Sequence, residues 1–279
     1  MLIDVVISTK NNVASKHFSL YWTIRSLLCQ KPHMLQIVVA DNGSEDTTVD
    51  SLRRTFGEVV GILDTSDCSG NLGASRNAAA TCGHADVILF MDDDIVLSTC
   101  DTLNQTIAIA CDVDFACGAR RLWAPLTWPD LIRMDDPFNK MVSTLRNTAY
   151  EPCSVNRVSG RNILDNRSYL ANFGALRRAA FRDLSGFDEE YTGWGYQDTD
   201  LMYRLCLAKY EYAVLANCGV TVYHLAHTVD KSGHYESNRK RFLDKQRAEG
   251  RYFHTNHFFE IYENDGYSLF TDFPEDRID

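Results

Sequence analysis

Short apolar runs alternate with segments of helical spacing through the first 120 residues. The runs have the length and the β-branched content of buried strands, and they fall at residues 2–8, 35–40, 59–63 and 86–91. Apolar side chains at helical spacing lie between them, at residues 18–29, 47–56 and 71–82. This rhythm predicts βαβ units, and therefore an α/β fold with a central, mostly parallel sheet flanked by helices.

The pattern changes after residue 120. Residues 120–168 are rich in turn formers and aromatic residues, which indicates an excursion across one face, a common place for a specificity element. Regular patterns return at residues 169–181 and 183–210, and two further strands are expected at 212–216 and 219–224. A charged helical pattern at 236–249 leads into an aromatic-rich end.

The polar strand ends are the first sign of chemistry. In a parallel sheet, ligands bind beyond the carboxyl ends of the strands. Four expected strand ends would therefore meet at one edge, and they carry polar residues at positions 8–11, 41–44, 67–71 and 92–94. A binding site assembled from four loops is expected there.

Three consecutive aspartates, Asp92, Asp93 and Asp94, follow the apolar run ILFM. Like charges this close repel one another unless a cation lies among them or water solvates them. A solvated turn is the ordinary interpretation of a lone Asp pair after a strand. Beside the other polar strand ends, the cluster favours a divalent cation such as Mg²⁺ or Mn²⁺, which prefers oxygen ligands.

Composition and charge narrow the class of partner. The chain has 279 residues, of which 45% are hydrophobic and 24% charged, an ordinary globular composition. Its net charge of −10 argues against a nucleic-acid backbone or an anionic membrane as the main partner. An anionic small ligand stays compatible, because a metal ion and a few local cations can hold it.

The chain carries no pattern of a secretion signal or a membrane span. It opens directly on an expected strand, and no apolar run approaches the roughly 18–20 residues that cross a bilayer. Nine cysteines lie scattered without a C-x-x-C pair. Buried, reduced thiols are therefore expected, rather than a zinc site or a disulfide framework, and the protein is predicted to be cytoplasmic.

Five segments, taken in order, resemble a family 2 glycosyltransferase. They are VVISTKNN, IVVADNGSED, GNLGASRN, LFMDDDI and GWGYQDTD, and the last is similar to the G-W-G-x-E-D-x-D segment of galactosyltransferases and N-acetylgalactosaminyltransferases. The resemblance implies a GT-A (Rossmann-like nucleotide-diphospho-sugar transferase) fold over 1–232. It implies a nucleotide-binding half at 1–119, an acceptor and catalytic half at 120–232, and a helical, aromatic-rich extension at 233–279.

The resemblance implies a UDP-sugar site at the strand ends. Asp41 would accept hydrogen bonds from uracil or ribose, the backbone at Ser8 and Thr9 would lie against the base, and Arg76 would contact the nucleotide. Asp41 could instead close an Asx turn, and Arg76 could be an ordinary surface residue. Asp41 and Arg76 also suit these contacts chemically, because a carboxylate accepts from N–H and hydroxyl groups and a helix start attracts anions.

The D-x-D match implies the metal chemistry. Asp94 would ligate Mn²⁺ or Mg²⁺, Asp92 would face the ribose and sugar, and Asp93 would orient the loop or meet the donor sugar. The third ligand would be His227, which has Asp and Lys three and four places on, with His224 as its substitute. A packed or solvated histidine is the ordinary alternative for either position.

The segment GWGYQDTD implies the reaction. Asp198 would be the base that takes the proton from an acceptor hydroxyl, giving inversion at the anomeric carbon, although a helix N-cap would also suit it. Gly193 and Gly195 would let the loop approach the substrate, and Trp194 would lie against a sugar.

Two further positions bear on the donor sugar. Gln197 stands where the family usually has Glu, at a position that commonly bonds sugar hydroxyls, so the donor preference is open at this point. Gly174, with Asn172 and Phe173, matches a strand that lines the donor-sugar pocket, and an ordinary strand is the alternative.

The predicted function is inverting, metal-dependent transfer of a hexose or N-acetylhexosamine from a UDP-sugar to a glycan, glycolipid or polypeptide hydroxyl. The alternatives are a nucleotide-sugar or glycan-binding protein with little turnover and, with less support, an aspartate-dependent phosphotransferase or phosphatase. Trp123, Trp128 and Tyr150 are candidates for the acceptor pocket or for core cover. The aromatic tail residues Phe258, Phe259 and Tyr262 would pack on the domain or dock on a partner or membrane.

Overall fold

The protein is described here from a computed structural model. The structure describes residues 2–16, 18–30, 34–68, 70–124, 137–148, 170–227, 233–253 and 270–272. All statements below concern these residues.

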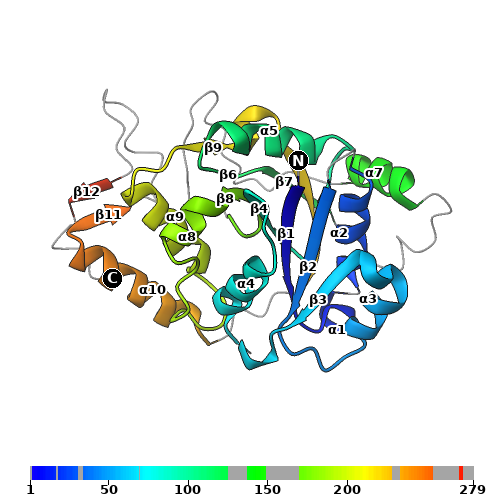
Figure 1. Cartoon of the computed structure of the whole chain (residues 1–279), viewed down its shortest axis with the longest axis horizontal. Helices are drawn as coiled ribbons and strands as arrows, with labels where there is room; N and C mark the ends of the chain where they lie inside the picture. The colour runs from blue at the N-terminus through cyan, green and yellow to red at the C-terminus, as the bar shows by residue number, and fades with distance from the viewer. Residues whose placement is uncertain are drawn as a thin grey trace.

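A seven-stranded sheet forms the centre of the molecule (Figure 1). Its strand order is β3-β2-β1-β4-β8-β6-β9, and β8 alone among these seven runs antiparallel to its neighbours. The strands are β1 (Leu2–Thr9), β2 (Met34–Asp41), β3 (Val60–Asp64), β4 (Val87–Asp92), β6 (Phe115–Cys117), β8 (Phe173–Arg177) and β9 (Tyr212–Val214). The predicted α/β fold with a mostly parallel sheet is confirmed.

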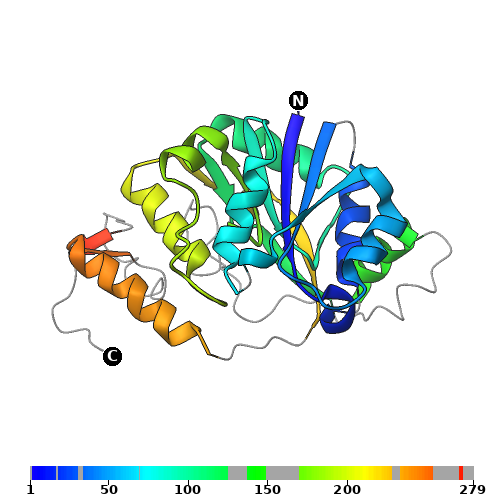
Figure 2. The same ribbon diagram turned by 60° about the horizontal axis from the view of Figure 1, so that its bottom comes forward.

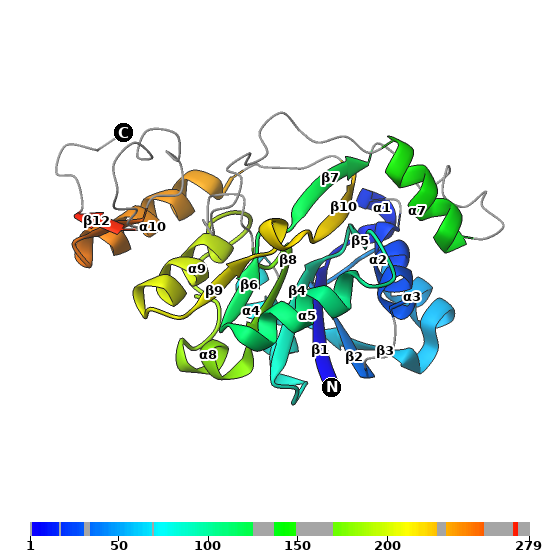
Figure 3. The ribbon, with the colours of Figure 1, turned by 90° about the horizontal axis from the view of Figure 1, so that it is seen from above.

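A second, three-stranded sheet crosses the carboxyl-terminal side of β4 (Figure 3). Its order is β5 (Ile95–Leu97), β10 (Thr221–Leu225) and β7 (Arg120–Ala124). The strand β10 runs antiparallel to β5 and parallel to β7, which pairs His224 with Ile95 and Leu225 with Ala124. This sheet brings the distant segment around residue 224 next to the aspartate cluster.

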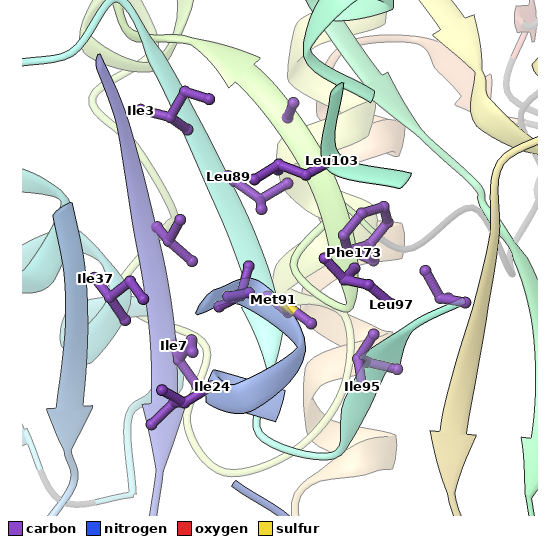
Figure 4. Packing of buried hydrophobic residues seen from close by; sticks show 14 of the residues in the cluster. Ile3, Ile7, Ile24, Ile37, Leu89, Met91, Ile95, Leu97, Leu103 and Phe173 are labelled. Atoms are coloured by element: carbon purple, nitrogen blue, oxygen red, sulfur yellow. The ribbon is translucent and has the colours of Figure 1, made fainter. Parts of the chain in front are cut away.

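Helices cover both faces of the central sheet, because alternate residues of a strand point to opposite faces. Ile3, Val5 and Ile7 of β1 join one buried cluster with Ile24 and Leu103 (Figure 4). Val6 joins the other cluster, together with residues of α4, α8 and α9. The helices are α1 (Asn12–Lys16), α2 (Ser19–Leu28), α3 (Thr48–Phe56), α4 (Leu72–Thr81), α5 (Thr102–Asp112), α7 (Pro137–Thr148), α8 (Arg178–Asp183), α9 (Gln197–Leu207) and α10 (Tyr235–Ala248), with short 3₁₀ helices η1 (Gly57–Val59), η2 (Ser66–Cys68) and η3 (Leu215–Cys218).

The C-terminal segment lies at the end of the molecule away from α3. Helix α10 runs along the outside of α9, as Figures 1 and 2 both show. The strands β11 (Arg251–Phe253) and β12 (Phe270–Asp272) then form an antiparallel pair. The predicted helix at 236–249 is confirmed, whereas the strand pair was not predicted.

Two expectations about the whole chain can be compared with the structure. Within the described residues, no helix combines the length and the apolar character needed to cross a bilayer. The eight cysteines that the structure describes are all free, as expected. The expectation that they are buried is wrong for Cys82, Cys100 and Cys218, which are exposed, because all three lie in or beside connecting segments at helix and strand ends.

Candidate active site

The predicted meeting of strand ends is confirmed by the register of the central sheet. Thr9 at the end of β1 lies beside Asp41 at the end of β2, and Ser8 lies beside Asp92 at the end of β4. Because these strands are parallel and adjacent, their polar ends form one edge. The aspartate cluster lies in the middle of that edge.

The three aspartates have three different environments. The Asp92 side chain is 32% exposed, whereas the side chains of Asp93 and Asp94 are 6% and 2% exposed. Asp93 accepts hydrogen bonds from Thr9 Oγ1 at 2.6 Å and Asn12 Nδ2 at 2.8 Å, and Lys16 Nζ lies 2.6 Å from its other oxygen. Asp93 thus ties β1 and α1 to the cluster, which agrees with the loop-orienting role among its two predicted roles.

Asp94 forms the centre of a group of potential metal ligands. His227 Nε2 lies 2.8 Å from Asp94 Oδ2, and His224 Nε2 lies 3.5 Å from Asp94 Oδ1. The three side chains can offer ligand atoms that all lie within 4.8 Å of one another. Sequence reasoning treated the two histidines as alternatives, whereas the structure brings both to Asp94.

The donor atoms of this group fit a divalent cation. Asp94 Oδ1 is buried and has no hydrogen-bond partner in the structure, which is costly unless a positive charge approaches it. Burial alone would raise the pKa of Asp94, but Lys16, His224 and His227 hold this pKa far below its usual value. One carboxylate and two imidazoles, with further positions for phosphate oxygens and water, suit Mn²⁺.

Backbone contacts fix the positions of these ligands. The N–H of Leu225 donates to the Asp94 carbonyl oxygen at 2.9 Å, and the N–H of Ala226 donates to the Ala124 carbonyl oxygen at 2.9 Å. The ring of Trp123 on β7 packs on His224, with centroids 4.4 Å apart. Trp123 therefore contacts a candidate metal ligand, and its predicted part in an acceptor pocket stays a prediction.

Asp92 belongs to a second group of side chains, together with Arg76 and Asn172. Arg76 Nη2 lies 3.1 Å from Asp92 Oδ1, and Asn172 Nδ2 donates to Asp92 Oδ2 at 2.7 Å. Arg76 is 7% exposed, so its interpretation as an ordinary surface arginine is wrong. The reason is that α4 packs on the sheet and directs Arg76 at the strand end, over the ring of Phe187 at 5.6 Å.

A chain of hydrogen-bonded hydroxyl groups runs along the edge formed by β1 and β2. Asp41 accepts hydrogen bonds from the Ser44 hydroxyl and from the Ser44 N–H at 3.1 Å, and so closes the turn after β2. Ser8, Ser75 and Thr65 then follow with oxygen–oxygen distances of 3.3 and 2.8 Å. The Asx-turn alternative for Asp41 is thus realised, and its contact with a nucleotide stays a prediction.

Asp198 lies in the first turn of α9. Its Oδ1 accepts a hydrogen bond from the Ala171 N–H at 3.2 Å. Burial, and then the charge of Asp92, raise the pKa of Asp198 to about 6, against the opposing charge of Arg76. The cap position of α9 is occupied by Tyr196, so the N-cap alternative for Asp198 is wrong.

The glycines before α9 lie against the start of α10. A Cβ at Gly193 would lie 2.5 Å from the His234 ring, and one at Gly195 would lie 3.0 Å from the Tyr235 ring. These glycines therefore give space to the start of α10, and the idea that they also let the loop approach a substrate stays a prediction. Trp194 between them is 41% exposed and stacks on Tyr235, with centroids 5.6 Å apart.

Gln197 and Gly174 have packing explanations. Gln197 is 4% exposed, and its Nε2 donates to the Gly193 carbonyl oxygen at 2.6 Å, a contact that a glutamate carboxylate could not make. A Cβ at Gly174 would lie 2.6 Å from the Leu170 carbonyl oxygen. Their contacts with a donor sugar stay predictions. Trp128, Tyr150, Phe258, Phe259 and Tyr262 lie outside the described residues.

Sequence reasoning missed Lys16 and Asn12. Both contact Asp93, and both lie in the short helix α1 directly after β1. The available signal was their spacing of four residues, which places side chains on one face of a helix, in the first loop of the expected ligand edge.

Known proteins resemble this chain over most of its length. The family described as glycosyltransferase like family 2 matches residues 5–216. The chain is 26% identical over 229 residues to the O-antigen chain rhamnosyltransferase RfbN of Salmonella typhimurium, which covers 80% of the chain and 62% of that protein. The chain thus spans less than two thirds of this curated relative.

Solved structures match over most of the chain. TarS 1-349 of S. aureus, in complex with UDP-GlcNAc, has a TM-score of 0.60 and 17% identity, with coverage of 88% of this chain and 66% of the TarS 1-349 chain. GalNAc-T7 with UDP, GalNAc and Mn²⁺ has a TM-score of 0.64 and 14% identity, with coverage of 88% and 48%. At these identities the likeness establishes the fold alone, and it confirms the predicted GT-A architecture.

Proposed function

The chain belongs to glycosyltransferase like family 2, and from this premise we propose that it transfers a hexose or N-acetylhexosamine from a UDP-sugar to an acceptor hydroxyl, with inversion and with the help of a divalent cation. The observation that carries the proposal is the convergence of Asp94, His224 and His227, at the same sheet edge as Asp92. Asp198 supplies the acid–base group, and the charges of Asp92 and Arg76 both act on its pKa.

The donor diphosphate is assigned to the edge formed by the ends of β1, β2 and β4. Asp94, His224 and His227 would hold Mn²⁺ or Mg²⁺, which when bound neutralises the charge that develops on the departing UDP. Arg76 lies beside Asp92 and supplies a fixed positive charge to the same edge. These three candidate ligands would come from both proposed halves of the domain. Asp94 belongs to the nucleotide half, residues 1–119, and the two histidines belong to the catalytic half, residues 120–232.

Asp198 would be the general base. Its pKa of about 6 leaves Asp198 ionised at neutral pH. Because this pKa is also close to neutral pH, Asp198 can accept a proton efficiently. The acceptor oxygen would give its proton to Asp198 as it attacks the anomeric carbon from the side opposite UDP. That geometry gives inversion.

Only the analogy with other transferases limits the range of candidate donor sugars. The segment GWGYQDTD resembles that of galactosyltransferases and N-acetylgalactosaminyltransferases, and TarS and GalNAc-T7 were solved with UDP-GlcNAc and with UDP and GalNAc. We therefore propose a UDP-hexose or UDP-N-acetylhexosamine. The acceptor is proposed to be a glycan, glycolipid or polypeptide hydroxyl, and the reaction is assigned to the cytoplasm.

Calorimetric titration with UDP, with and without Mn²⁺, tests the proposal. We expect binding that requires Mn²⁺ in the wild type and in Asp244→Ala, a control that removes a surface carboxylate on α10. Asp94→Ala should abolish it. Release of UDP from a panel of UDP-sugars then tests turnover. If UDP fails to bind with and without metal, the proposal is wrong; tight binding without turnover would favour a sugar-nucleotide-binding protein.

A further inference from the structure

The loop from Thr192 to Tyr196 has an unusual backbone. Three of its residues have positive φ, with values of 63° at Gly193, 107° at Gly195 and 68° at Tyr196. Glycine adopts such angles at little cost, but a residue with a Cβ such as Tyr196 is disfavoured there. A strained conformation of this kind persists only when its surroundings hold it, and this loop leads directly into α9 and Asp198.

Two side-chain amides hold the loop by its carbonyl oxygens. Gln197 Nε2 donates to the Gly193 oxygen at 2.6 Å. Asn238 Nδ2 lies 2.8 Å from the Thr192 oxygen, 3.0 Å from the Gly195 oxygen and 3.4 Å from the Trp194 oxygen. All four consecutive carbonyl groups, 192 to 195, therefore face one of these two amide nitrogens.

Asn238 is itself buried, with 3% exposure, and it comes from α10. Its position next to the loop is fixed because α10 is anchored on α9 further along. Lys245 Nζ lies 2.7 Å from Asp200 Oδ1, a fully buried carboxylate on α9, and also contacts Asp188. The ring of Phe242 packs on Tyr196 and Tyr203, with centroids 5.5 and 5.6 Å away.

Helix α10 begins at Tyr235, beyond the residues 5–216 that match the family. We infer that Asn238 is a positioning residue for the transfer reaction, and that α10 serves to hold Asn238 against the loop. Through the carbonyl groups of residues 192–195, Asn238 sets the loop that carries Trp194 and the start of α9 that carries Asp198. The inference rests on the proposed function for its effect on turnover, but the restraint of the loop does not.

The nearly isosteric change Asn238→Asp is the sharpest test. It keeps the volume of the side chain, removes the N–H donors and turns a carboxylate toward three carbonyl oxygens, whereas Asn238→Ala removes the donors without adding repulsion. Lys240→Ala on the exposed side of α10, where the Lys240 side chain is 78% exposed, is the matched control. Each protein is assayed as the full chain.

We expect kcat to fall about tenfold in Asn238→Ala and about a hundredfold in Asn238→Asp, because small misplacements of reacting groups have effects of that size. The affinity for UDP with Mn²⁺ should stay within about twofold of the wild type, since its groups lie on other elements. The control should match the wild type in both measurements. A residue that only packs would give the opposite order, with the isosteric Asp variant closer to the wild type than Ala.

Hydrogen exchange separates this inference from the proposed function. Amide exchange in peptides covering residues 192–197 should be faster in both Asn238 variants, while exchange in β1 and β4 stays unchanged, whether or not the wild type transfers a sugar. Unchanged exchange in the loop, or faster exchange throughout the chain, overturns the inference. A wild type without turnover, but with the local exchange response, would refute the proposed function alone.

Discussion

Lys16 Nζ lies 2.6 Å from Asp94 Oδ2, the oxygen that His227 Nε2 also contacts. A built-in cation therefore already contacts one carboxylate oxygen of Asp94, while the other oxygen, Oδ1, has no hydrogen-bond partner. The charges of Asp93, Asp94 and Asp92 raise the pKa of Lys16 despite the opposing effect of burial, so the amine is charged at every pH at which the protein would work. Lys16 and a bound metal ion would compete for the same negative charge.

Lys16→Met should therefore tighten Mn²⁺ binding in the absence of nucleotide. Removal of one positive charge close to the ion should make Mn²⁺ binding more favourable by at least about 1.4 kcal/mol at an effective dielectric constant of about 20. This energy corresponds to about tenfold higher affinity. Titration followed by the Mn²⁺ electron paramagnetic resonance signal measures it, with Lys240→Met as a remote control. Weaker binding in Lys16→Met would mean that Lys16 organises the aspartates for the ion instead of opposing it.

His224 and His227 should each contribute to metal binding, because both contact Asp94 in the same structure. We expect His224→Ala and His227→Ala to weaken Mn²⁺ binding by about tenfold to a hundredfold each. His84→Ala, which changes a histidine in the connection before β4, is the control. If only one of the two variants loses affinity, the metal has a single histidine ligand, as the sequence alone suggested.

The pH dependence of turnover should follow Asp198. Its pKa is raised to about 6, and a base must be ionised to act, so kcat/KM should rise through about pH 6 and level off above it. Asp198→Asn should lower kcat by about a hundredfold to ten-thousandfold and remove this inflection. A profile of the residual activity that keeps the same inflection would assign it to another group.

The same shift has a consequence for stability with a definite sign. Because the folded-state pKa of Asp198 lies above its unfolded value of 3.8, the protonated form is favoured by folding, and stability is lost as the pH rises from about 4 to 6. The free energy of unfolding of Asp198→Asn should therefore exceed that of the wild type by about 1–3 kcal/mol at pH 7.5, and by less at pH 4. Urea denaturation at the two pH values measures the difference, and a variant less stable than the wild type at pH 7.5 would contradict it.

Two glycine substitutions should differ strongly in stability. Asp4 and Arg178 form a buried ion pair, and a Cβ at Gly83 would collide with the Asp4 carboxylate. Gly83→Ala should therefore lower the free energy of unfolding by about 3 kcal/mol, the usual scale for a disrupted buried pair. Gly61→Ala is the control, since its Cβ would meet its nearest atom at an ordinary 3.5 Å. Equal stability of the two variants would mean that the Asp4 region rearranges freely.

Gln197→Glu tests the one departure from the family motif. The amide nitrogen of Gln197 holds the Gly193 carbonyl group, and a carboxylate in its place would repel that oxygen. We therefore expect kcat to fall about tenfold, together with faster exchange in residues 192–197. If glutamate instead raises turnover, position 197 acts on the sugar as in the family motif, and its contact with Gly193 is incidental.

The strand and helix pattern of the first 120 residues could be read from the sequence because it depends on local periodicity. The strands β1 to β4 and the helices α2 to α4 lie within two residues of the predicted ranges. The meeting of Ser8, Asp41 and Asp92 at one edge followed from the parallel topology, which the register confirms. Short strands such as β5 and β12 carry too few residues for a periodic signal.

Contacts between distant segments were not accessible in the same way. Lys16 at Asp94, Asn238 at the loop before α9 and Trp123 at His224 each depend on how two separate elements pack. The sequence identified Gly193 and Gly195 as special but not their contacts with the rings of His234 and Tyr235, which come from a different segment. Spacing can indicate that a residue is needed, but the partner is set by the tertiary fold.

The flanks of residues 125–169 have an evolutionary consequence. On one side, Ala124 is joined to the strand whose Leu225 binds the backbone of Asp94; on the other, Ala171 donates to Asp198. Both flanks of this stretch are therefore anchored next to the candidate site, one in a sheet and the other on α9. Evolution can vary the sequence of residues 125–169 while the elements that carry the proposed metal ligands and the proposed base stay the same.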